Sequence, residues 1–422
     1  MSGRRRGRIL CLTSNFPRWT GDSTTPFVLH LARDLQELGW RVDVLAPHAP
    51  GTATREILDG VQVERFRYLW PARLETVCYR GGALINLRRH PSNALKLPAL
   101  VLAEWAASLR RLAGRRYDLL HSHWILPQGF TGALAAWPLG VPHVLSVHGG
   151  DVFALRGRWL THCKRFALHR ADAVTVNSSV TGQAVQAIAG MRPQLQRIPM
   201  GVTVAPVARD DPRVQRLRQQ HRRGDGPLLV FVGRLVEEKG VADLLHALGV
   251  LLPELPEASA LVVGEGQDRP ALEALARQLG VAQRVVFSGW VAPEEVGCYL
   301  AAGDVFVGPS RRGRDGWVEA QGLSFIEAMI AGTPVVATRV GGIIDSVRDG
   351  ETGLLVPERS PGAIAAAVRR LVADPALVAR LRRQGYALAT TAFSRPASAA
   401  AFDRLFEQLR GRRLAANPRP LE

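Results

Sequence analysis

The feature that most constrains the fold is an alternation of short β-rich runs with amphipathic helical stretches, which occurs twice along the chain. In the first half, apolar runs at 8–16, 41–47 and 143–149 alternate with helical segments such as 27–40. The pattern restarts at residue 228, after the polar, proline-bearing stretch TVAPVARDDPRVQRLRQQHRRGDGP. Strands that alternate with helices predict parallel sheets with right-handed crossovers. Because a chain of 422 residues also exceeds what one core usually serves, we predict two doubly wound α/β domains.

The predicted boundaries follow from the stretch between the two copies of the pattern. Residues 1–204 form a predicted N-terminal Rossmann-like domain, and residues 205–394 form a predicted C-terminal one. The helix expected within 395–422 is predicted to pack back on the first domain. Ligands of doubly wound sheets bind beyond the carboxyl ends of the strands. The residues that directly follow strands, around an expected crevice between the two sheets, are therefore the candidates for function.

The positive charge of the chain is unevenly distributed. The formal net charge is +17. Residues 1–200 hold 26 Lys and Arg against 12 Asp and Glu, a balance of +14, and residues 65–117 hold 11 against 2, a balance of +9. This asymmetry favours an anionic partner for the first half, such as nucleic acid, an anionic membrane surface or a phosphate-bearing substrate. An arginine-rich composition inherited from a GC-rich genome accounts for the same numbers, and both explanations stay open.

Cysteine usage and apolar runs indicate the compartment. The four cysteines are scattered and form no C-x-x-C pair or zinc spacing, which is typical of a reduced compartment. The sequence has no apolar stretch approaching the roughly 18–20 residues of a membrane span. Its basic start is not followed by an apolar run long enough for a signal peptide. We expect a cytoplasmic protein, with peripheral attachment to the inner face of the cell membrane as a possibility that the basic first half raises.

A basic loop follows the first strand of the second pattern. In FVGRLVEEKG, Arg234 and Lys239 lie between the end of a strand and the start of a helix. Arginine binds phosphate oxygens bidentately, lysine adds a point charge, and the helix N-terminus adds its dipole. The next strand ends in Gly264 and Gly266, but Arg269 occupies the place of the third glycine in a dinucleotide fingerprint. The loop predicts a phosphate site without NAD, and a solvated helix cap is the alternative explanation.

Histidines follow two strands of the first pattern. In SVHGGDVF, His148 and Asp151 come directly after a strand. Histidine can donate a hydrogen bond to a sugar hydroxyl or a phosphate, whereas a strand-end histidine bonded to backbone is the alternative. His121 and His123 in HSHW have the look of a metal-binding pair, but the sequence offers no third ligand. No metal site is predicted.

Two carboxylates lie eight positions apart in EAQGLSFIEAMIAGTPVVA. Gly322 ends a loop, and a helix is expected from about Leu323, so that Glu319 precedes the helix and Glu327 lies one turn inside it. Glu319 can accept hydrogen bonds from sugar hydroxyls, and the Glu327 carboxylate suits the two O–H donors of a ribose diol. Backbone N–H groups at Leu323 and Ser324 are expected to face the ligand. The alternative is that both acids are favoured only by the helix dipole.

These motifs resemble those of family-four glycosyltransferases. The resemblance is carried by FVGRLVEEKG, VVGEGQDR, VVFSGWV and EAQGLSFIEAMIAGTPVVATRVGG; it covers nearly the whole chain and is most specific in the C-terminal half. It implies the GT-B fold, in which two Rossmann-like domains face each other across a crevice. It also implies retaining transfer of a hexosyl unit from a UDP- or GDP-sugar to a sugar or lipid-linked acceptor. The nucleotide sugar is then a substrate, and neither a cofactor nor a metal is implied. Surface polysaccharide or glycolipid assembly is the implied setting.

The resemblance also implies roles for individual residues. Arg234 and Lys239 match the pair that holds the donor diphosphate. Glu327 matches the acid that binds the ribose, and Glu319 matches the acid that contacts the donor sugar. His148 matches the acceptor-side histidine near the reacting centre.

Further positions complete the implied site. Trp290 and Val291 match the segment that packs on the nucleotide base, and Asp151 lies on the acceptor side beside the histidine. The first loop, GDSTTPF, departs from the usual double glycine because Gly21 stands alone, which puts a phosphate contact there in doubt. The remaining donor-binding positions lie at strand ends and at the helix start: Gly264, Gly266, Gly322, Leu323 and Ser324.

Two other functions compete with glycosyl transfer. A sugar-nucleotide epimerase shares the implied architecture, and a non-catalytic sugar- or nucleic-acid-binding module can inherit it. The intact set of Arg234, Lys239, Glu319 and Glu327 argues against the module, and the glutamate pair favours transfer over epimerisation. Nucleic acid is not expected as a partner, because no nucleic-acid-binding motif accompanies the basic residues.

Overall fold

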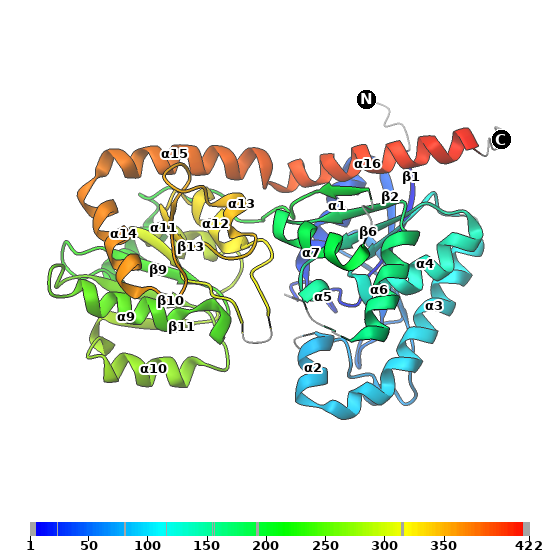
Figure 1. The fold of residues 1–422 in the computed structure, drawn as a ribbon, viewed down its shortest axis with the longest axis horizontal. Helices are drawn as coiled ribbons and strands as arrows, with labels where there is room; N and C mark the ends of the chain where they lie inside the picture. The colour runs from blue at the N-terminus through cyan, green and yellow to red at the C-terminus, as the bar shows by residue number, and fades with distance from the viewer. Residues whose placement is uncertain are drawn as a thin grey trace. The chain divides into compact units, whose positions relative to one another are not determined.

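The computed structural model describes most of the chain, namely residues 6–22, 24–79, 82–114, 116–153, 155, 157–190, 194–313 and 316–416. The chain divides into two compact units (Figure 1). Unit 1 consists of Met1–Gly201 together with Arg395–Glu422, and unit 2 consists of Val202–Ser394. Each unit holds one sheet with helices on both faces, as the alternation of strands and helices predicted.

In the described residues, unit 1 holds an eight-stranded sheet in the order β3-β4-β2-β1-β5-β6-β7-β8. Every neighbouring pair is parallel except β3 and β4, which are antiparallel. The strands are β1 (Gly7–Leu12), β2 (Trp40–Pro47), β3 (Arg55–Leu58), β4 (Val61–Phe66), β5 (Leu119–His123), β6 (His143–Val147), β7 (Ala173–Val176) and β8 (Leu195–Arg197). The helices are α1 (Pro26–Glu37), α2 (Ala83–Arg89), α3 (Leu97–Ala113), α4 (Phe130–Ala136), α5 (Gly150–Phe153), α6 (Arg158–Arg170), α7 (Ser179–Ala189) and α16 (Arg395–Ala416).

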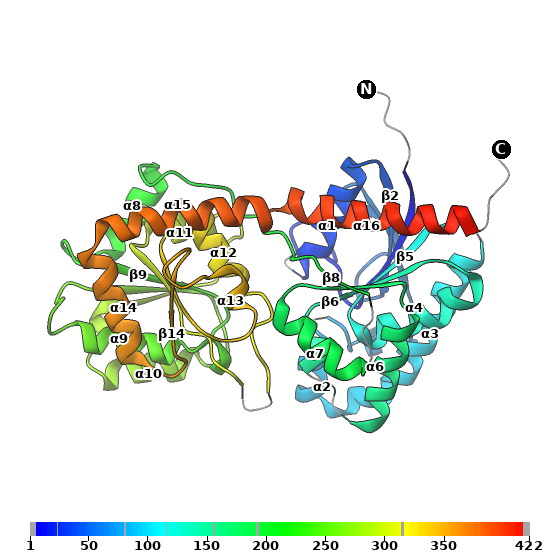
Figure 2. The same ribbon diagram turned by 45° about the horizontal axis from the view of Figure 1, so that its top comes forward.

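Alternate residues of each strand in unit 1 face opposite helical layers. Ile9 and Cys11 pack in one cluster with α1 and α16, whereas Leu10 and Leu12 pack in another with α3 and α4. Helices α6 and α7 join the α3 side, over β6 and β7. Figures 1 and 2 show α1 and α16 lying side by side on one face of this sheet. Because side chains along a strand alternate in direction, both faces of a strand covered in this way must be apolar.

Unit 2 repeats the arrangement with a six-stranded parallel sheet in the order β11-β10-β9-β12-β13-β14 within the described residues. One face packs against α9, α10 and α14, and the other packs against α8, α11 and α12. The strands are β9 (Leu228–Val232), β10 (Ser259–Val263), β11 (Val285–Gly289), β12 (Val305–Gly308), β13 (Val335–Thr338) and β14 (Leu354–Val356). The helices are α8 (Pro212–His221), α9 (Val241–Leu251), α10 (Arg269–Gln278), α11 (Val296–Ala302), α12 (Leu323–Ile330), α13 (Ile343–Ser346), α14 (Pro361–Ala373) and α15 (Pro375–Ala392).

The segment before α3 is helical although prolines recur in it. Recurrent prolines are typical of an irregular chain. The structure instead shows α2, then a 3-10 turn at Pro91–Lys96, then α3 from Leu97. Pro91 and Pro98 lie in the first turns of these two elements, where a missing backbone N–H costs no helical hydrogen bond. The prolines therefore start helices here rather than break them.

The hairpin of β3 and β4 was not predicted from the sequence. Asp59 and Gly60 connect the two strands with φ angles of 46° and 83°. An Asp-Gly pair with both residues in the left-handed region is the preferred two-residue hairpin turn, because its twist matches that of the strands. The signal was present in the sequence as LDGV, between two short apolar runs.

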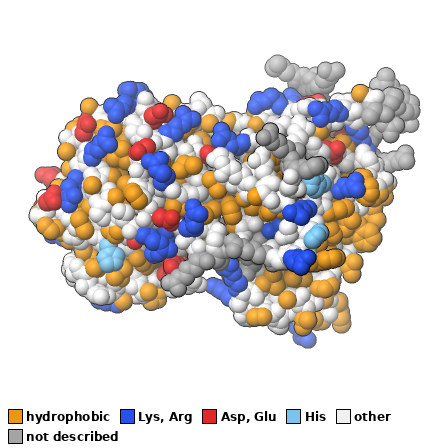
Figure 3. Space-filling model, viewed as in Figure 1, with side chains coloured by type: hydrophobic (Ala, Val, Ile, Leu, Met, Phe, Trp, Pro, Cys, Tyr) orange, Lys and Arg blue, Asp and Glu red, His pale blue; other side chains and the backbone are white. Residues whose placement is uncertain are grey.

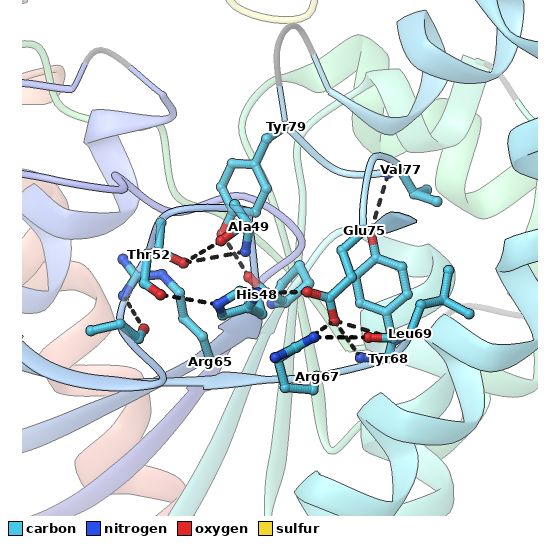
Figure 4. A network of polar contacts seen from close by, with 12 residues as sticks. His48, Ala49, Thr52, Arg65, Arg67, Tyr68, Leu69, Glu75, Val77 and Tyr79 are labelled. Carbon is cyan, nitrogen blue, oxygen red and sulfur yellow. Dashed lines mark hydrogen bonds and ion pairs between the residues drawn. The ribbon is translucent and has the colours of Figure 1, made fainter. Parts of the chain in front are cut away.

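A buried polar network ties the end of β2 to the segment that follows β4 (Figure 4). The His48 ring lies with Nδ1 2.5 Å from Glu75 Oε2 and with Nε2 3.0 Å from the carbonyl oxygen of Thr52. The ring is thus held between the Glu75 carboxyl group and the Thr52 carbonyl oxygen. The other Glu75 oxygen accepts from Arg67 Nε at 3.0 Å and from the backbone N–H of Tyr68 at 2.9 Å. This carboxylate thereby holds the two chain segments together.

Among the described helices, none combines the length and the apolar character needed to cross a membrane.

Candidate active site

The basic loop predicted to bind phosphate lies at the carboxyl end of β9. Arg234 is exposed and makes no ion pair or side-chain hydrogen bond with the described part of the chain. Lys239 ends a 3-10 turn, Glu237–Lys239, and α9 starts after Gly240. Gly240 has φ 69°, and a Cβ there would lie 1.9 Å from the carbonyl oxygen of Pro309 at the end of β12. Only glycine allows this close approach, which fixes the loop that presents the two cations.

Lys239 and Glu319 form an ion pair in this structure. Both side chains are largely buried, and the Lys239 ammonium also lies 5.8 Å from the centre of the Trp317 ring. The backbone of Glu319 is held from the other side, because its carbonyl oxygen accepts from the N–H of Gly342 at 2.7 Å. A Cβ at Gly341 would lie 2.1 Å from the same oxygen. The two glycines after β13 therefore position the acid beside the lysine.

Glu327 lies inside α12, one turn after the helix start that the sequence predicted at Leu323. Its side chain is half-buried, and its carboxylate has no hydrogen-bond donor among the described residues. Burial raises the pKa of Glu327 to about 7, and the positive charge of Lys239 opposes that rise. A carboxylate without a protein partner can accept hydrogen bonds from a ligand.

The predicted donor-binding glycines after β10 pack against the loop that carries Arg234. A Cβ at Gly264 would lie 2.0 Å from the carbonyl oxygen of Gly233, and one at Gly266 would lie 2.1 Å from that of Leu235. The N–H of Leu235 donates to the carbonyl of Glu265 at 2.9 Å. These glycines therefore shape the Arg234 loop through close backbone contact, a role that the spacing G-x-G did not reveal.

The remaining predicted donor-side residues surround this end of unit 2. Gly322 has φ 74° and precedes α12, where a Cβ would lie 2.6 Å from the Phe325 ring. Leu323 and Ser324 are half-buried at the first turn of the helix. Trp290 follows β11 with 64% of its surface exposed, whereas its neighbour Val291 is half-buried against the core.

The predicted acceptor-side residues belong to unit 1. His148 follows β6, and its Nε2 lies 2.9 Å from His123 Nδ1 at the end of β5. Asp151 is buried and accepts from the backbone N–H groups of Ile125 at 2.8 Å and Gly149 at 3.0 Å. Burial raises the pKa of Asp151, and these backbone donors oppose that rise. The Asp151 carboxylate therefore joins two loops, and its oxygens are directed to backbone rather than away from the protein.

The loop before α1 carries the last predicted position. Gly21 is exposed with φ 84°, and a Cβ there would meet no atom within 4 Å. Residue 23 of the GDSTTPF stretch lies outside the described residues, as do residues 314 and 315 of SRRGRDGW. Within the described part of the chain, no group of His, Cys, Asp and Glu side chains has the arrangement of a metal site.

Sequence reasoning missed two contributors to these clusters. Trp317 lies over the Lys239 ammonium, but nothing in the SRRGRDGW run indicated that its last residue would turn toward the β9 loop. His123 contacts His148, and the signal was available, because HSHW and SVHG end neighbouring strands of the same parallel sheet. His121 and His123 were considered only as possible metal ligands.

Comparisons with known proteins identify the family. The family described as Glycosyl transferase 4-like domain matches residues 24–201, and that described as Glycosyl transferases group 1 matches residues 214–388. The GDP-mannose-dependent alpha-(1-6)-phosphatidylinositol monomannoside mannosyltransferase of Mycolicibacterium smegmatis is 35% identical over 295 residues, which cover 68% of this chain and 75% of that protein. The chain belongs to the group 1, or family-four, glycosyltransferases.

Other relatives of this glycosyltransferase extend the match along the chain. The 2-deoxystreptamine glucosyltransferase of Streptomyces kanamyceticus is 30% identical and covers 85% of this chain and 92% of that protein. The solved structure of sucrose-phosphate synthase from Thermosynechococcus elongatus superposes with a TM-score of 0.74 at 25% identity, over 96% of this chain and 100% of the other. The predicted GT-B fold, family and retaining glycosyltransferase activity are confirmed.

Proposed function

We propose that this glycosyltransferase moves a hexosyl unit, with retention at the anomeric carbon, from a nucleotide diphosphosugar to a lipid-linked or sugar acceptor. The observation that carries the proposal is the cluster at the carboxyl end of the unit 2 sheet. There the Lys239–Glu319 ion pair lies close enough to Glu327 for the Lys239 charge to act on its carboxylate, which has no donor among the described residues. Arg234, in the same loop as Lys239, is exposed and has no partner in the described part of the chain. Two cations and two acids suit a ligand that combines a diphosphate with two sugars.

The cations have the chemistry to hold the leaving group. When the bond between the anomeric carbon and the phosphate oxygen breaks, negative charge develops on the departing nucleoside diphosphate. Arg234 can bind phosphate oxygens bidentately, and Lys239 adds a compact positive charge. Because glycine contacts fix the backbone of their loop, these charges need little reorganisation as the reaction proceeds.

The acids have the chemistry to hold the two sugars. Glu327 accepts hydrogen bonds from the ribose diol, for which two O–H donors and one carboxylate are matched. Glu319 accepts from hydroxyls of the transferred sugar once Lys239 turns to the phosphate. The ion pair of the ligand-free protein is then a resting arrangement that keeps both buried charges partnered until the donor binds.

The transfer itself needs no covalent bond to the enzyme. The acceptor hydroxyl attacks the anomeric carbon on the face from which the phosphate departs. Its oxygen forms the new glycosidic bond, and its proton passes to the departing phosphate oxygen. His148 lies on the acceptor side in this scheme and donates a hydrogen bond to a sugar oxygen.

The relatives guide the choice of donor and acceptor to be tested first. The mannosyltransferase of M. smegmatis is named for GDP-mannose and a phosphatidylinositol monomannoside, so GDP-mannose and a lipid-linked acceptor come first. The glucosyltransferase of S. kanamyceticus is named for 2-deoxystreptamine, so a soluble aminocyclitol is the second acceptor. Trp290 and Val291 are the proposed neighbours of the nucleotide base.

An anionic membrane surface is the proposed second partner, and it is bound by an apolar face on unit 1. Leu95 is 85% exposed before α3, and Leu102 and Trp105 are 61% and 37% exposed on it. Figure 3 shows hydrophobic side chains gathered at the right-hand edge of unit 1, where Figure 1 labels α3. Exposed arginines at 88 and 89 lie nearby in the chain, and residues 80 and 115 of the basic stretch lie outside the described residues. Apolar side chains with flanking arginines suit an anionic bilayer interface.

Product analysis tests the proposed transfer. The protein is incubated with GDP-mannose or UDP-glucose, with and without acceptor, and the product linkage is assigned by NMR. We expect one donor to be consumed, and the anomeric configuration of the product to equal that of the donor. A product of inverted configuration, or a free epimerised sugar nucleotide, would contradict the proposal.

Vesicle binding tests the proposed membrane face separately. We expect strong binding to vesicles of phosphatidylglycerol and weak binding to vesicles of phosphatidylcholine, because attraction to anionic headgroups adds to apolar contact. Replacing Leu102 and Trp105 by serine is expected to abolish the binding, whereas Val250→Ser, at an exposed position of unit 2, leaves it unchanged. Equal binding to both kinds of vesicle would remove this partner.

A further inference from the structure

Within the described part of the chain, one ring nitrogen of His148 is bonded to another histidine and the other nitrogen has no partner. His123 Nδ1 and His148 Nε2 lie 2.9 Å apart. The two rings are inclined by only 10°, with their centres 5.2 Å apart. Nearly coplanar rings at this separation share a hydrogen bond within the ring plane, so that one proton lies between the two nitrogens. No other hydrogen bond is made by the His148 ring within the described residues.

Aromatic side chains restrict the remaining freedom of the His148 ring. The ring centre of Phe27 lies 5.0 Å away, and that of Trp124 lies 5.1 Å away. Trp124 follows His123 directly with φ 73°, an angle that non-glycine residues seldom adopt, and its N–H donates to the carbonyl of Ser146 at 2.8 Å. The end of β5 is thus bent so that His123 and Trp124 both face His148.

The protonation of the pair follows from burial and from unpartnered atoms. Burial lowers the pKa of His148 to about 3 and holds that of His123 well below its usual value, so both rings are neutral near pH 7. His123 Nε2 has no hydrogen-bond partner among the described residues. If His123 carries its proton on Nδ1, the unpartnered N–H falls on the half-buried His148, where water or a ligand can accept it. The other arrangement leaves an unpartnered N–H on His123, which is only 1% exposed, and a buried N–H without a partner is rare. The proton of His123 therefore belongs on Nδ1, which donates to His148 Nε2.

We propose that His123 is a positioning residue, which by donating to Nε2 of His148 fixes that ring and keeps the His148 proton on Nδ1, directed at the sugar ligand. The hydrogen bond made by one ring nitrogen decides which other nitrogen carries a proton. The inference deepens the proposed function, because it assumes that His148 contacts a sugar oxygen. His123 itself touches no substrate.

Two substitutions at position 123 separate positioning from packing. His123→Leu removes the donor, and we expect kcat to fall about 10- to 100-fold, as for other partners that orient a histidine. KM for the nucleotide sugar should change little, because the proposed diphosphate and ribose contacts lie in unit 2. His123→Asn keeps a polar N–H group near the position of Nδ1, and we expect it to restore most of the lost turnover. His121→Asn is the matched control, since His121 is equally buried on β5 but bonds to Ser146 at 2.7 Å rather than to His148.

Nitrogen NMR of the His148 ring gives a readout that packing alone would not move. In the wild-type protein and in H121N, we expect a single tautomer with the proton on Nδ1. In H123L we expect a mixture of tautomers, together with the fall in kcat. An unchanged His148 tautomer in H123L, or full turnover in H123L while His148→Ala is inactive, would overturn the inference. If His148→Ala is itself fully active, the proposed contact of His148 with the sugar fails, and the inference fails with it. That outcome leaves the predicted NMR spectrum intact, so the two failures can be told apart.

Discussion

Unit 1 and unit 2 each contain a glutamate whose pKa is raised to about 7, yet the two acids have opposite surroundings. Glu104 of α3 is completely buried in unit 1 and accepts hydrogen bonds from Gln128 at 2.9 Å and Thr131 at 3.0 Å. Glu327 of α12 is only half-buried in unit 2 and has no donor within the described residues. Burial lies behind both raised pKa values. The two acids therefore differ in their hydrogen-bond donors and not in their pKa. Glu104 is bonded within the fold, whereas Glu327 can accept from a ligand.

The same contrast holds for the two candidate sites. In unit 1, the group around His148 is neutral, enclosed by aromatic rings and joined by hydrogen bonds. In unit 2, the group around Lys239 is charged, and its loops are fixed by glycines rather than by side chains. A diphosphate requires fixed positive charge, whereas a sugar hydroxyl requires a directed neutral hydrogen bond. The difference between the units therefore matches a division of labour between donor and acceptor.

The largest effect is expected in unit 2, at the exposed Arg234. Arg234→Ala should lower kcat about 100- to 1,000-fold, which is the loss typical of one donor to a developing negative charge. Because Arg234 has no partner among the described residues, thermal stability should stay unchanged. Steady-state kinetics and thermal melting check both parts. Arg277→Ala, at another exposed arginine in unit 2, is the control and should keep full activity. Full turnover in R234A would remove the phosphate role.

The second-largest effect concerns Glu104, the fully buried acid of unit 1. Its folded-state pKa of about 7 exceeds the ordinary value of 4.5, so folding takes up a proton between these values. The contribution of Glu104 to the free energy of unfolding should therefore be fully present below pH 4.5, and about 3 kcal/mol of it should be lost as pH rises to 7 and beyond.

The Glu104→Gln variant tests whether Glu104 causes this pH dependence. The amide cannot ionise, so the fall in stability should largely disappear, and urea unfolding at pH 5 and pH 8 would show it. Glu37→Gln, at an exposed acid of α1, should leave the wild-type pH dependence in place. A wild-type slope in E104Q would contradict the assignment.

A smaller effect compares two glycines with positive φ in unit 2. Gly341 has φ 59° and its Cβ would meet the carbonyl of Glu319, whereas Gly332 has φ 72° and its Cβ would meet nothing within 4 Å. Alanine at Gly332 should cost about 1–2 kcal/mol of stability through backbone strain, and alanine at Gly341 should cost more, because its Cβ also clashes with a backbone oxygen. Only G341A should also lower kcat, because it displaces Glu319. Equal activity of the two variants would show that the loop after β13 does not position this acid.

The smallest effect is the pH dependence of donor binding. As pH falls below about 7, Glu327 becomes protonated and loses acceptor capacity for the ribose, so Kd for a nucleotide sugar should rise up to tenfold per pH unit. A nucleotide sugar is used because a terminal phosphate would itself titrate near pH 6. Calorimetry from pH 5.5 to 8 should show the trend in the wild-type protein and a flat profile in Glu327→Gln. A flat wild-type profile would show that the ionised Glu327 carboxylate does not bind the donor, and that Glu327 does not differ from Glu104 in this way.

The sequence was most informative where one local rule decides the structure. The alternation of strands and helices predicted both sheets, and the glycine after EAQ predicted the start of α12 at Leu323. It was less informative where residues distant in the chain meet. Trp317, which follows β12, reaches Lys239, which follows the neighbouring strand β9, and Gly264 meets Gly233 through backbone contact. Neither contact has a periodic signature, because both depend on how neighbouring strand ends are placed in the sheet.

The hydrogen-bond partners of the site residues could not be predicted from the sequence either. HSHW suggested two metal ligands, but β5 and β6 are neighbours, and their register places His123 opposite Ser146, so that it faces His148 two residues on. Similarly, SVHGGDVF gave no indication that the Asp151 carboxylate would turn back to the N–H of Ile125. A residue type indicates what chemistry is available, whereas the fold decides whether that chemistry is directed at the protein or at a ligand.

A crystal structure with a bound nucleoside diphosphate tests the central claim most directly. The account predicts the diphosphate within hydrogen-bond distance of Arg234 and Lys239, with the Lys239–Glu319 ion pair opened and the ribose diol on Glu327. A nucleotide bound away from the loop at 234–239, with that ion pair intact, would contradict it.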